Sequence, residues 1–224
     1  QLIRAASDPS EQQPLAPAGG TRPLFDNPRR ISMKHTRNLL ALAIAGLMAT
    51  SGMAMTKEEH SAAKDRISAD YKAAKAKCDG MTGNAKDVCM KEAKGAENVA
   101  KAELEAQYKP SAKANEKVAD ARANAAYDVA KEKCDDLTGD AKNVCQKDAK
   151  AAQVKAKEDA KVARTAATPT DDPAKQQAKV AEAKKDASAE KREADYKAAK
   201  ERCDTMNGDA KDKCVADAKR MYAQ

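Results

Sequence analysis

Large hydrophobic and aromatic side chains are scarce in this 224-residue sequence. It contains no tryptophan, and its one phenylalanine is Phe25. From residue 55 onward, the only isoleucine and leucines are Ile67, Leu104 and Leu137. Strands are rich in Val, Ile and aromatic residues, and ligand pockets are built in large apolar cores. The scarcity therefore excludes an all-β or α/β domain and argues against an enzyme built around a pocket.

Histidine is also scarce, and closely spaced cysteine pairs are missing. His60 is the only histidine after residue 54, and we interpret it as a solvated side chain. The sequence has no glycine-rich phosphate loop and no Ser/His/Asp set that a catalytic triad would need. It also lacks the CxxC pairs that are typical of zinc sites and redox enzymes. We therefore expect no enzyme activity, no catalytic residue, no metal site and no cofactor.

Charge of one sign does not dominate either. Residues 55–224 contain 36 Lys and Arg against 32 Asp and Glu, a net charge of +4, and the two signs interleave. A nucleic-acid-binding surface needs clustered basic charge, so nucleic acid is an unlikely partner. Alanine, lysine and glutamate are strong helix formers. The composition therefore predicts an all-α protein of long, alanine-rich helices.

The segment 33–54 has the pattern of a secretory signal peptide. Lys34 and Arg37 form a positive start, residues 39–49 are apolar, and small residues precede Met55. The apolar stretch is shorter than the roughly 20 residues that a membrane-spanning helix needs. We expect cleavage before Met55, no transmembrane anchor afterwards, and a periplasmic or secreted bacterial protein. Residues 1–32 precede this signal, and we expect them to be a disordered, non-native upstream extension of a protein that starts at Met33.

One cysteine-bracketed string occurs three times, as CDGMTGNAKDVC, CDDLTGDAKNVC and CDTMNGDAKDKC. In each copy Tyr, Ala and Cys precede the turn at spacings of three and four, which lie on one helix face. After it, Cys and Ala continue at similar spacings, as in Cys89, Ala93, Ala96 and Ala100. The glycine of each copy can end a helix in the left-handed conformation, and Asn84, Asp140 and Asp209 are expected N-caps.

Each copy therefore predicts a helix, a short turn and a second helix, with one cysteine on either side of the turn. Identical spacing in three copies singles out one pairing among the 15 that six cysteines allow. An oxidising compartment favours disulfides over the rival metal and redox sites. We predict the disulfides Cys78–Cys89, Cys134–Cys145 and Cys203–Cys214.

The domain organisation follows from these turns. Pro110 and Ser111 interrupt the helical pattern, and Asp172 before Pro173 has the pattern of an N-cap followed by a first-turn proline. The copies are 56 and 69 residues apart, which argues against a regular solenoid. The hairpins form either a loose bundle or an extended coiled-coil-like array. We expect helical hairpins at 55–110, 111–166 and 172–224, with a linker at 167–177.

The stretches AKAAQVKAKEDAKVAR (149–164) and AKVAEAKKDASAEKREADYKAAKER (178–202) combine Ala, Lys, Asp and Glu behind an export signal. In this composition the chain resembles secreted proteobacterial proteins labelled TolA-like, after a cell-envelope protein. The resemblance implies a helical protein of the cell envelope.

Three functions fit these features. The first is a non-catalytic structural or interaction protein of the periplasm, which presents charged, alanine-rich helices to a protein or envelope-polymer partner. The second is a stress-protective hydrophilic protein, similar to late-embryogenesis-abundant proteins. The third is a weak binder of anionic envelope polymers through lysine side chains. No small-molecule substrate is expected.

Overall fold

The computed structural model describes residues 55–223, and they are almost entirely helical. No strand occurs in this part of the chain, so the predicted all-α class is confirmed. The predicted signal peptide, 33–54, and the predicted extension, 1–32, lie outside the described residues. The elements in chain order are α1 (Lys57–Cys78), α2 (Gly83–Tyr108), α3 (Ala112–Lys133), the 3-10 turn η1 (Cys134–Asp136), α4 (Gly139–Ala167), α5 (Pro173–Asp204) and α6 (Gly208–Tyr222).

Side-chain caps fix three of the helix starts. At α1, Thr56 accepts a hydrogen bond from the Glu59 amide while the Glu59 carboxylate accepts one from Thr56 N, which is a capping box. Ser111 caps α3, and Asp172 caps α5 ahead of Pro173, as predicted. Because α5 begins at Pro173, only residues 168–172 lie between α4 and α5. The predicted linker 167–177 was therefore too long at its C-terminal end.

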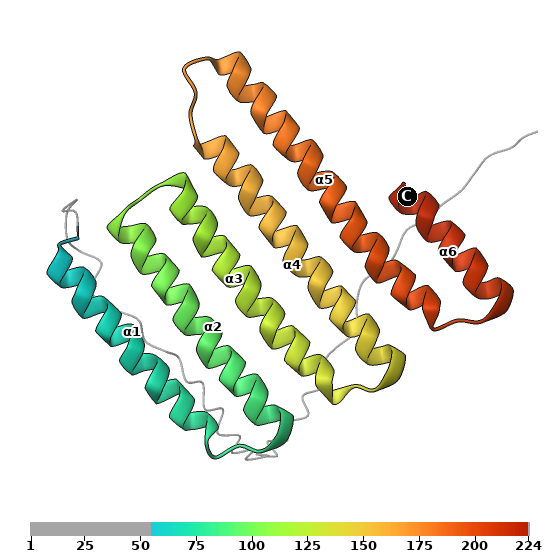
Figure 1. Cartoon of the computed structure of the whole chain (residues 1–224), viewed down its shortest axis with the longest axis horizontal. Coiled ribbons are helices and arrows are strands. Elements are labelled where there is room, and N and C mark those ends of the chain that lie inside the picture. Colours follow the sequence, from blue (N-terminus) through green and yellow to red (C-terminus); the bar gives the residue numbers. More distant parts are fainter. Residues whose placement is uncertain (1–54, 224) are drawn as a thin grey trace, which may run out of the picture. The chain divides into compact units, whose positions relative to one another are not determined.

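The helices pack as a single layer in which each helix lies beside its neighbours in the sequence (Figure 1). Helix α1 packs on α2, α2 on α3, α3 on α4, α4 on α5, and α5 on α6. The packing of α2 on α3 and of α4 on α5 joins the three predicted hairpins to one another. Among the described helices, extensive contact is confined to these consecutive pairs. Of the two arrangements left open by the sequence, the structure adopts the extended array.

The seams between helices are thin and consist mainly of small residues. Their most buried members are the cysteines Cys78, Cys134 and Cys203, together with alanines and Leu104. The predicted stripes before each turn are confirmed, because their Tyr and Ala residues are half-buried and their cysteines fully buried. The prediction that the stripes after the turns are buried was wrong in part. The side chains of Ala96, Ala152 and Ala156 are exposed, because α2 and α4 each turn two other sides toward their two neighbours.

A glycine brings α2 unusually close to α3. Gly95 is buried in the interior of α2, and a Cβ atom at this position would lie 2.7 Å from the Ala125 Cβ. Such a distance is shorter than real Cβ contacts. Gly95 therefore sets the spacing of this seam, at a cost in helix propensity of about 1 kcal/mol relative to alanine.

Candidate functional site

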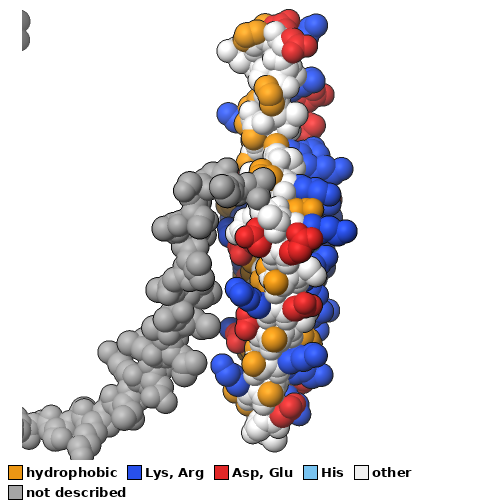
Figure 2. Space-filling model, turned by 90° about the vertical axis from the view of Figure 1, so that its left-hand side faces the viewer, with side chains coloured by type: hydrophobic (Ala, Val, Ile, Leu, Met, Phe, Trp, Pro, Cys, Tyr) orange, Lys and Arg blue, Asp and Glu red, His pale blue; other side chains and the backbone are white. Residues whose placement is uncertain are grey.

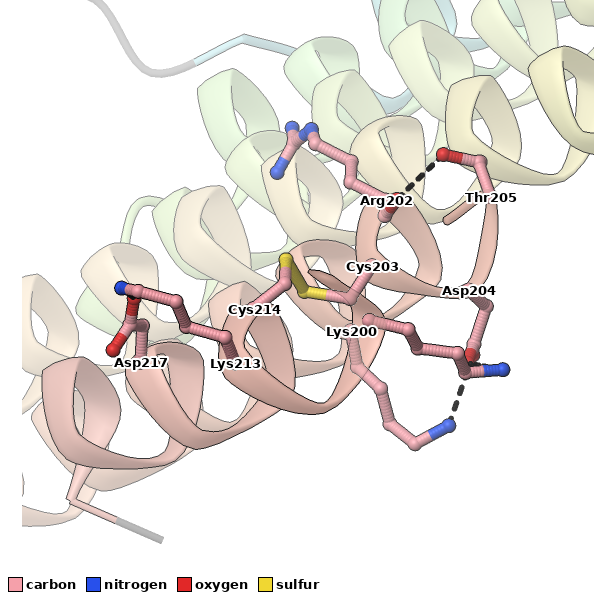
Figure 3. Close-up of a disulfide and its surroundings, with 9 residues drawn as sticks. Lys200, Arg202, Cys203, Asp204, Thr205, Lys213, Cys214 and Asp217 are labelled. Carbon is pink, nitrogen blue, oxygen red and sulfur yellow. Dashed lines mark hydrogen bonds and ion pairs between the residues drawn. A yellow bond between two sulfur atoms is a disulfide. The ribbon is translucent and has the colours of Figure 1, made fainter. Parts of the chain in front are cut away.

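The three disulfides are the most distinctive chemical feature of the described chain, and all three have the predicted pairing. Their Cα–Cα distances are 5.6 Å for Cys78–Cys89, 5.7 Å for Cys134–Cys145 and 5.5 Å for Cys203–Cys214. No free cysteine remains. Figure 3 shows the third disulfide, which joins the end of α5 to the first turns of α6. Buried, oxidised cysteines of this kind act as structural crosslinks rather than as nucleophiles.

The turns between the paired cysteines share one backbone conformation. Gly83, Gly139 and Gly208 have φ values of 57°, 54° and 57°, in the left-handed region that favours glycine. The expected side-chain caps at Asn84, Asp140 and Asp209 are not observed. These residues lie within the first turn of the following helix, and among the described residues no helix amide donates a hydrogen bond to their side chains. Asp140 and Asp209 instead place negative charge near the positive end of the helix dipole.

An ion pair reinforces two of the three turns. The aspartate directly after the first cysteine pairs with the lysine eight residues after that cysteine, at 2.9 Å for Asp135–Lys142 and 3.0 Å for Asp204–Lys211. The hydrogen bond from Lys142 lowers the pKa of Asp135. Hydrogen bonds from Lys200 and Lys211 lower the pKa of Asp204. In these two turns an ion pair therefore supplements the disulfide.

Each turn also exposes one apolar side chain at its tip. Met81, Leu137 and Met206 occupy the third position after the first cysteine of each copy, with exposed fractions of 42%, 41% and 42%. The three turns lie at the same end of the helical layer, while the α2–α3 and α4–α5 connections lie at the opposite end (Figure 1). We call these three residues the turn tips. They were not predicted from the sequence, although their identical position in three copies was a usable signal.

The hollows of the described surface are shallow and lie between neighbouring helices. One of them has a volume of about 550 Å³ and lies beside the second and third turns. The Asp148–Arg202 ion pair, with an N–O distance of 2.5 Å, crosses it. Its other lining residues are Ala141, Val144, Cys145 and Thr205. These residues offer no set of acid, base and nucleophile, so the hollow gives no basis for catalysis.

His60 is placed differently from the prediction. Its ring stacks on Tyr108 with centroids 4.2 Å apart, and its Nε2 lies 3.0 Å from the Glu105 carboxylate. The His60 side chain is only 12% exposed, so the interpretation as a solvated residue was wrong. Tyr108, at the end of α2, covers it because α1 and α2 are antiparallel. This contact fastens the free end of the first hairpin.

The described residues contain neither a metal-binding cluster nor a membrane-spanning helix. Residues 55–223 contain no group of three or more His, Cys, Asp or Glu side chains arranged to hold a metal ion. Within the same range, no helix combines the length and apolar character that crossing a membrane requires. Comparisons of the chain with protein-family models, curated proteins and solved structures gave no match. The function must therefore be argued from the residues themselves.

Proposed function

We propose that the protein is an exported, non-catalytic interaction protein of the bacterial cell envelope, which presents its charged, alanine-rich helices to a partner. The observation that carries this proposal is the single layer of helices with three disulfide turns. A single layer leaves both of its broad sides uncovered, and the disulfides hold the hairpins in register. Such a design yields much surface and little interior, which suits contact with a partner rather than chemistry.

The disulfides support the choice of compartment. Protein disulfides form and persist in oxidising environments and are rare in the cytosol. Together with the expected signal peptide at 33–54, they favour the periplasm or secretion. The turn tips support an interaction role, because each of the three turns exposes one apolar side chain and the turns lie at one end of the layer. We therefore place the first contact with a protein partner at this end.

Two measurements test the proposal. The first is the intact mass of the protein recovered from the periplasm, followed by a peptide map without reduction. We expect a chain that begins at Met55 and carries the three local disulfides. Free thiols in the recovered protein would contradict the assignment to an oxidising compartment.

The second measurement is crosslinking in cells. A photo-reactive side chain replaces Leu137 at a turn tip, and the same side chain replaces Thr168 at the opposite end of the layer as the matched control. We expect a discrete crosslinked product from position 137 and a weaker one or none from position 168. A protein that stays monomeric and uncrosslinked at both positions would contradict an interaction with a protein partner at the turn tips.

A further inference from the structure

The two broad sides of the helical layer differ in how their charges are arranged. Residues two positions apart on a helix point about 200° apart. When one of them faces one broad side of the layer, the other therefore faces the opposite side. On α2, for example, Lys101 and Glu103 face opposite sides. Because each inner helix contacts neighbours only along its flanks, both sides are open to solvent. The charges of each side can therefore be compared directly.

On one side, basic and acidic side chains of neighbouring helices neutralise one another. Glu92 and Glu103 are eleven residues apart, about three helical turns, so they share a side of α2. The same spacing separates their partners Lys133 and Arg122 on α3, and also Asp148 and Asp159 on α4. We call this side the ion-pair face; its pairs between helices are Glu92–Lys133, Glu103–Arg122, Asp148–Arg202, Lys155–Asp195 and Asp159–Lys191.

The other side carries an excess of lysine over α1 to α4. Its position is marked by Lys94 above the Tyr71 ring and Lys150 above the Tyr127 ring, at 5.2 Å and 5.3 Å from the ring centroids. No ion pair is observed among the described residues for the further lysines of this side that we name here. We call this side the lysine face; these unpaired members are Lys75 on α1, Lys113, Lys117 and Lys131 on α3, and Lys157 on α4.

Acidic side chains on the lysine face of α1 to α4 are fewer and partly engaged. Glu97 is buried between Lys94 and Lys101, and Glu105 contacts His60 and Lys64. Glu132 pairs with Lys91 and Glu158 with Lys161, and Asp87, Asp120 and Asp128 also lie on this side. On α5 this side carries no such excess, because lysines there are matched by Glu182, Asp186, Glu190 and Glu193, and Lys197 pairs with Glu193. Figure 2 agrees with this asymmetry, because Lys and Arg side chains gather along one edge of the layer in that view.

A hollow on the lysine face adds a concave element to this charge. It lies between α2 and α3 near their connection and has a volume of about 500 Å³. Four lysines, one serine and one glutamate contribute its polar side chains, and alanines complete it. The polar members are Lys101, Glu105, Lys109, Ser111, Lys113 and Lys117. Its size and its lysine excess suit a phosphate-bearing headgroup.

The chemistry of this side favours anionic lipid over nucleic acid. Its cations are mainly lysines, which act as flexible point charges rather than as the planar forks of arginine that read bases. Tyr71 and Tyr127, whose rings would be needed to stack on bases, already lie beneath lysines. The charge is also spread over four parallel axes, each about 10 Å from the next, rather than along one groove. An extended surface of anionic headgroups matches this pattern.

We propose that the lysine face docks on a membrane surface that contains anionic phospholipid. This inference rests on the proposed function, since it names the class of envelope component that one side of the layer contacts. Attraction between lysines and anionic headgroups decays within about one Debye length, so the contact is reversible and weakens as salt rises. The ion-pair face then points away from the membrane.

The test compares the full chain with two variants that lose four positive charges each. The lysine-face variant carries K75Q, K113Q, K117Q and K157Q. The matched control carries R66Q, K77Q, K184Q and R192Q, which remove charge from the opposite side of α1 and α5. Residues 1–54 are identical in all three proteins, so any contribution from them cancels. Circular dichroism and a non-reduced peptide map establish that each protein is folded and oxidised.

Binding is measured by co-sedimentation with vesicles of phosphatidylethanolamine that contain about one third phosphatidylglycerol, and with neutral vesicles. We expect the full chain to bind the anionic vesicles only and to be released by salt. The lysine-face variant should lose at least about tenfold in affinity, whereas the control should lose much less. An equal loss of affinity in both variants would show that binding depends on net charge and not on the lysine face, and would overturn the proposal.

Two further outcomes would also overturn it. Equal binding to neutral vesicles would show that the attraction is not electrostatic. Tighter binding to soluble polyphosphate than to anionic vesicles would identify a polymer rather than a membrane as the partner. Neither outcome affects the crosslinking test at Leu137, so a failure of the lipid contact can be told from a failure of the proposed function.

Discussion

Glu97 is a charged residue held almost entirely within the layer, with an exposed fraction of 7%. Its carboxylate accepts hydrogen bonds from Lys94 and Lys101, both at 2.7 Å. The bond from Lys101, followed by that from Lys94, lowers the pKa of Glu97 despite the opposing effect of burial. A charge that is buried and paired in this way makes the stability of the α1–α2 region depend on pH.

We expect the substitution E97Q to destabilise the protein at neutral pH and to have less effect in acid. A carboxyl group with a lowered pKa in the folded state stabilises the protein above its ordinary pKa of 4.5, and this contribution is lost as pH falls through the folded-state value. Urea unfolding of both proteins at pH 7 and at about pH 3 measures the difference. The control is E92Q, at an exposed carboxylate paired with Lys133 at 3.4 Å. A constant difference between wild type and E97Q across this range would contradict the assignment.

Gly95 supplies a second prediction for a single residue. The substitution G95A adds a methyl group where a Cβ meets the Ala125 Cβ at 2.7 Å, so α2 and α3 must separate. We expect a loss of about 1–3 kcal/mol from overpacking, which outweighs the gain of about 1 kcal/mol in helix propensity. The double variant G95A/A125G should recover part of the loss.

Gly80 is the matched control for Gly95, because a Cβ at Gly80 meets no atom within 4 Å. Denaturant midpoints of the four proteins, with wild type as reference, measure these differences. If G95A were as stable as G80A, the close approach of α2 to α3 would not exist in solution.

At the scale of the helix, the disulfides matter most where a helix has only one neighbour. Helix α6 has 15 residues and, among the described helices, packs extensively only on α5, whereas α4 is held by α3 and by α5. A disulfide that closes a short loop stabilises by about 3 kcal/mol through restriction of the unfolded chain. The Cys203–Cys214 disulfide therefore supplies much of what holds α6, while Cys134–Cys145 reinforces helices that are already held.

We expect C203A/C214A to release α6 and to leave the other helices folded. Hydrogen exchange of the amides in 208–222 should become fast, with little change in α1 to α4. The control C134A/C145A should lower the stability of α3 and α4 by about 3 kcal/mol without fast exchange confined to one helix. Slow exchange throughout α6 in C203A/C214A would show that packing on α5 suffices by itself.

The helices, their turns and the cysteine pairing could be predicted because local signals repeat along the chain. Tyr71, Ala74 and Cys78 lie on one stripe, and the same stripe occurs before the other two turns. The stripe after the turn failed at Ala96 because alanine gains little from burial, so its spacing does not reveal which side of a helix is covered. His60 was missed because its partners Tyr108 and Glu105 come from a distant part of the sequence.

The order of the helices in the layer could not be predicted from the sequence, for a related reason. The contacts that join the hairpins are single small residues and ion pairs between distant segments, such as Gly95 with Ala125 and Glu103 with Arg122. None of these has a local pattern that distinguishes it from the many other Ala, Gly, Lys and Glu residues. The turn tips are the exception, because a comparison of the three copies reveals them.

At the scale of the whole described unit, stability should be distributed rather than cooperative. Each helix contacts only its neighbours in the sequence, as repeats do in a linear array, so the energy is close to a sum of neighbouring terms. A chain that ends at residue 167 removes α5 and α6 and leaves the seams between α1 and α4 intact. It uncovers Ala151 and Glu158 on α4 and breaks three α4–α5 ion pairs, whose members on α4 are Asp148, Lys155 and Asp159.

We therefore expect the chain 1–167 to keep its helices, with circular dichroism that falls in proportion to the helical residues removed. Its thermal midpoint should fall by several degrees, since α4 loses its packing on α5. The control is a chain that ends at residue 133, within the second hairpin. It keeps Cys78–Cys89 as its only disulfide. Its α3 should then be held by α2 alone. If removal of α5 and α6 instead unfolded all of α1 to α4, the layer would be one cooperative unit and the neighbour-only description would be wrong.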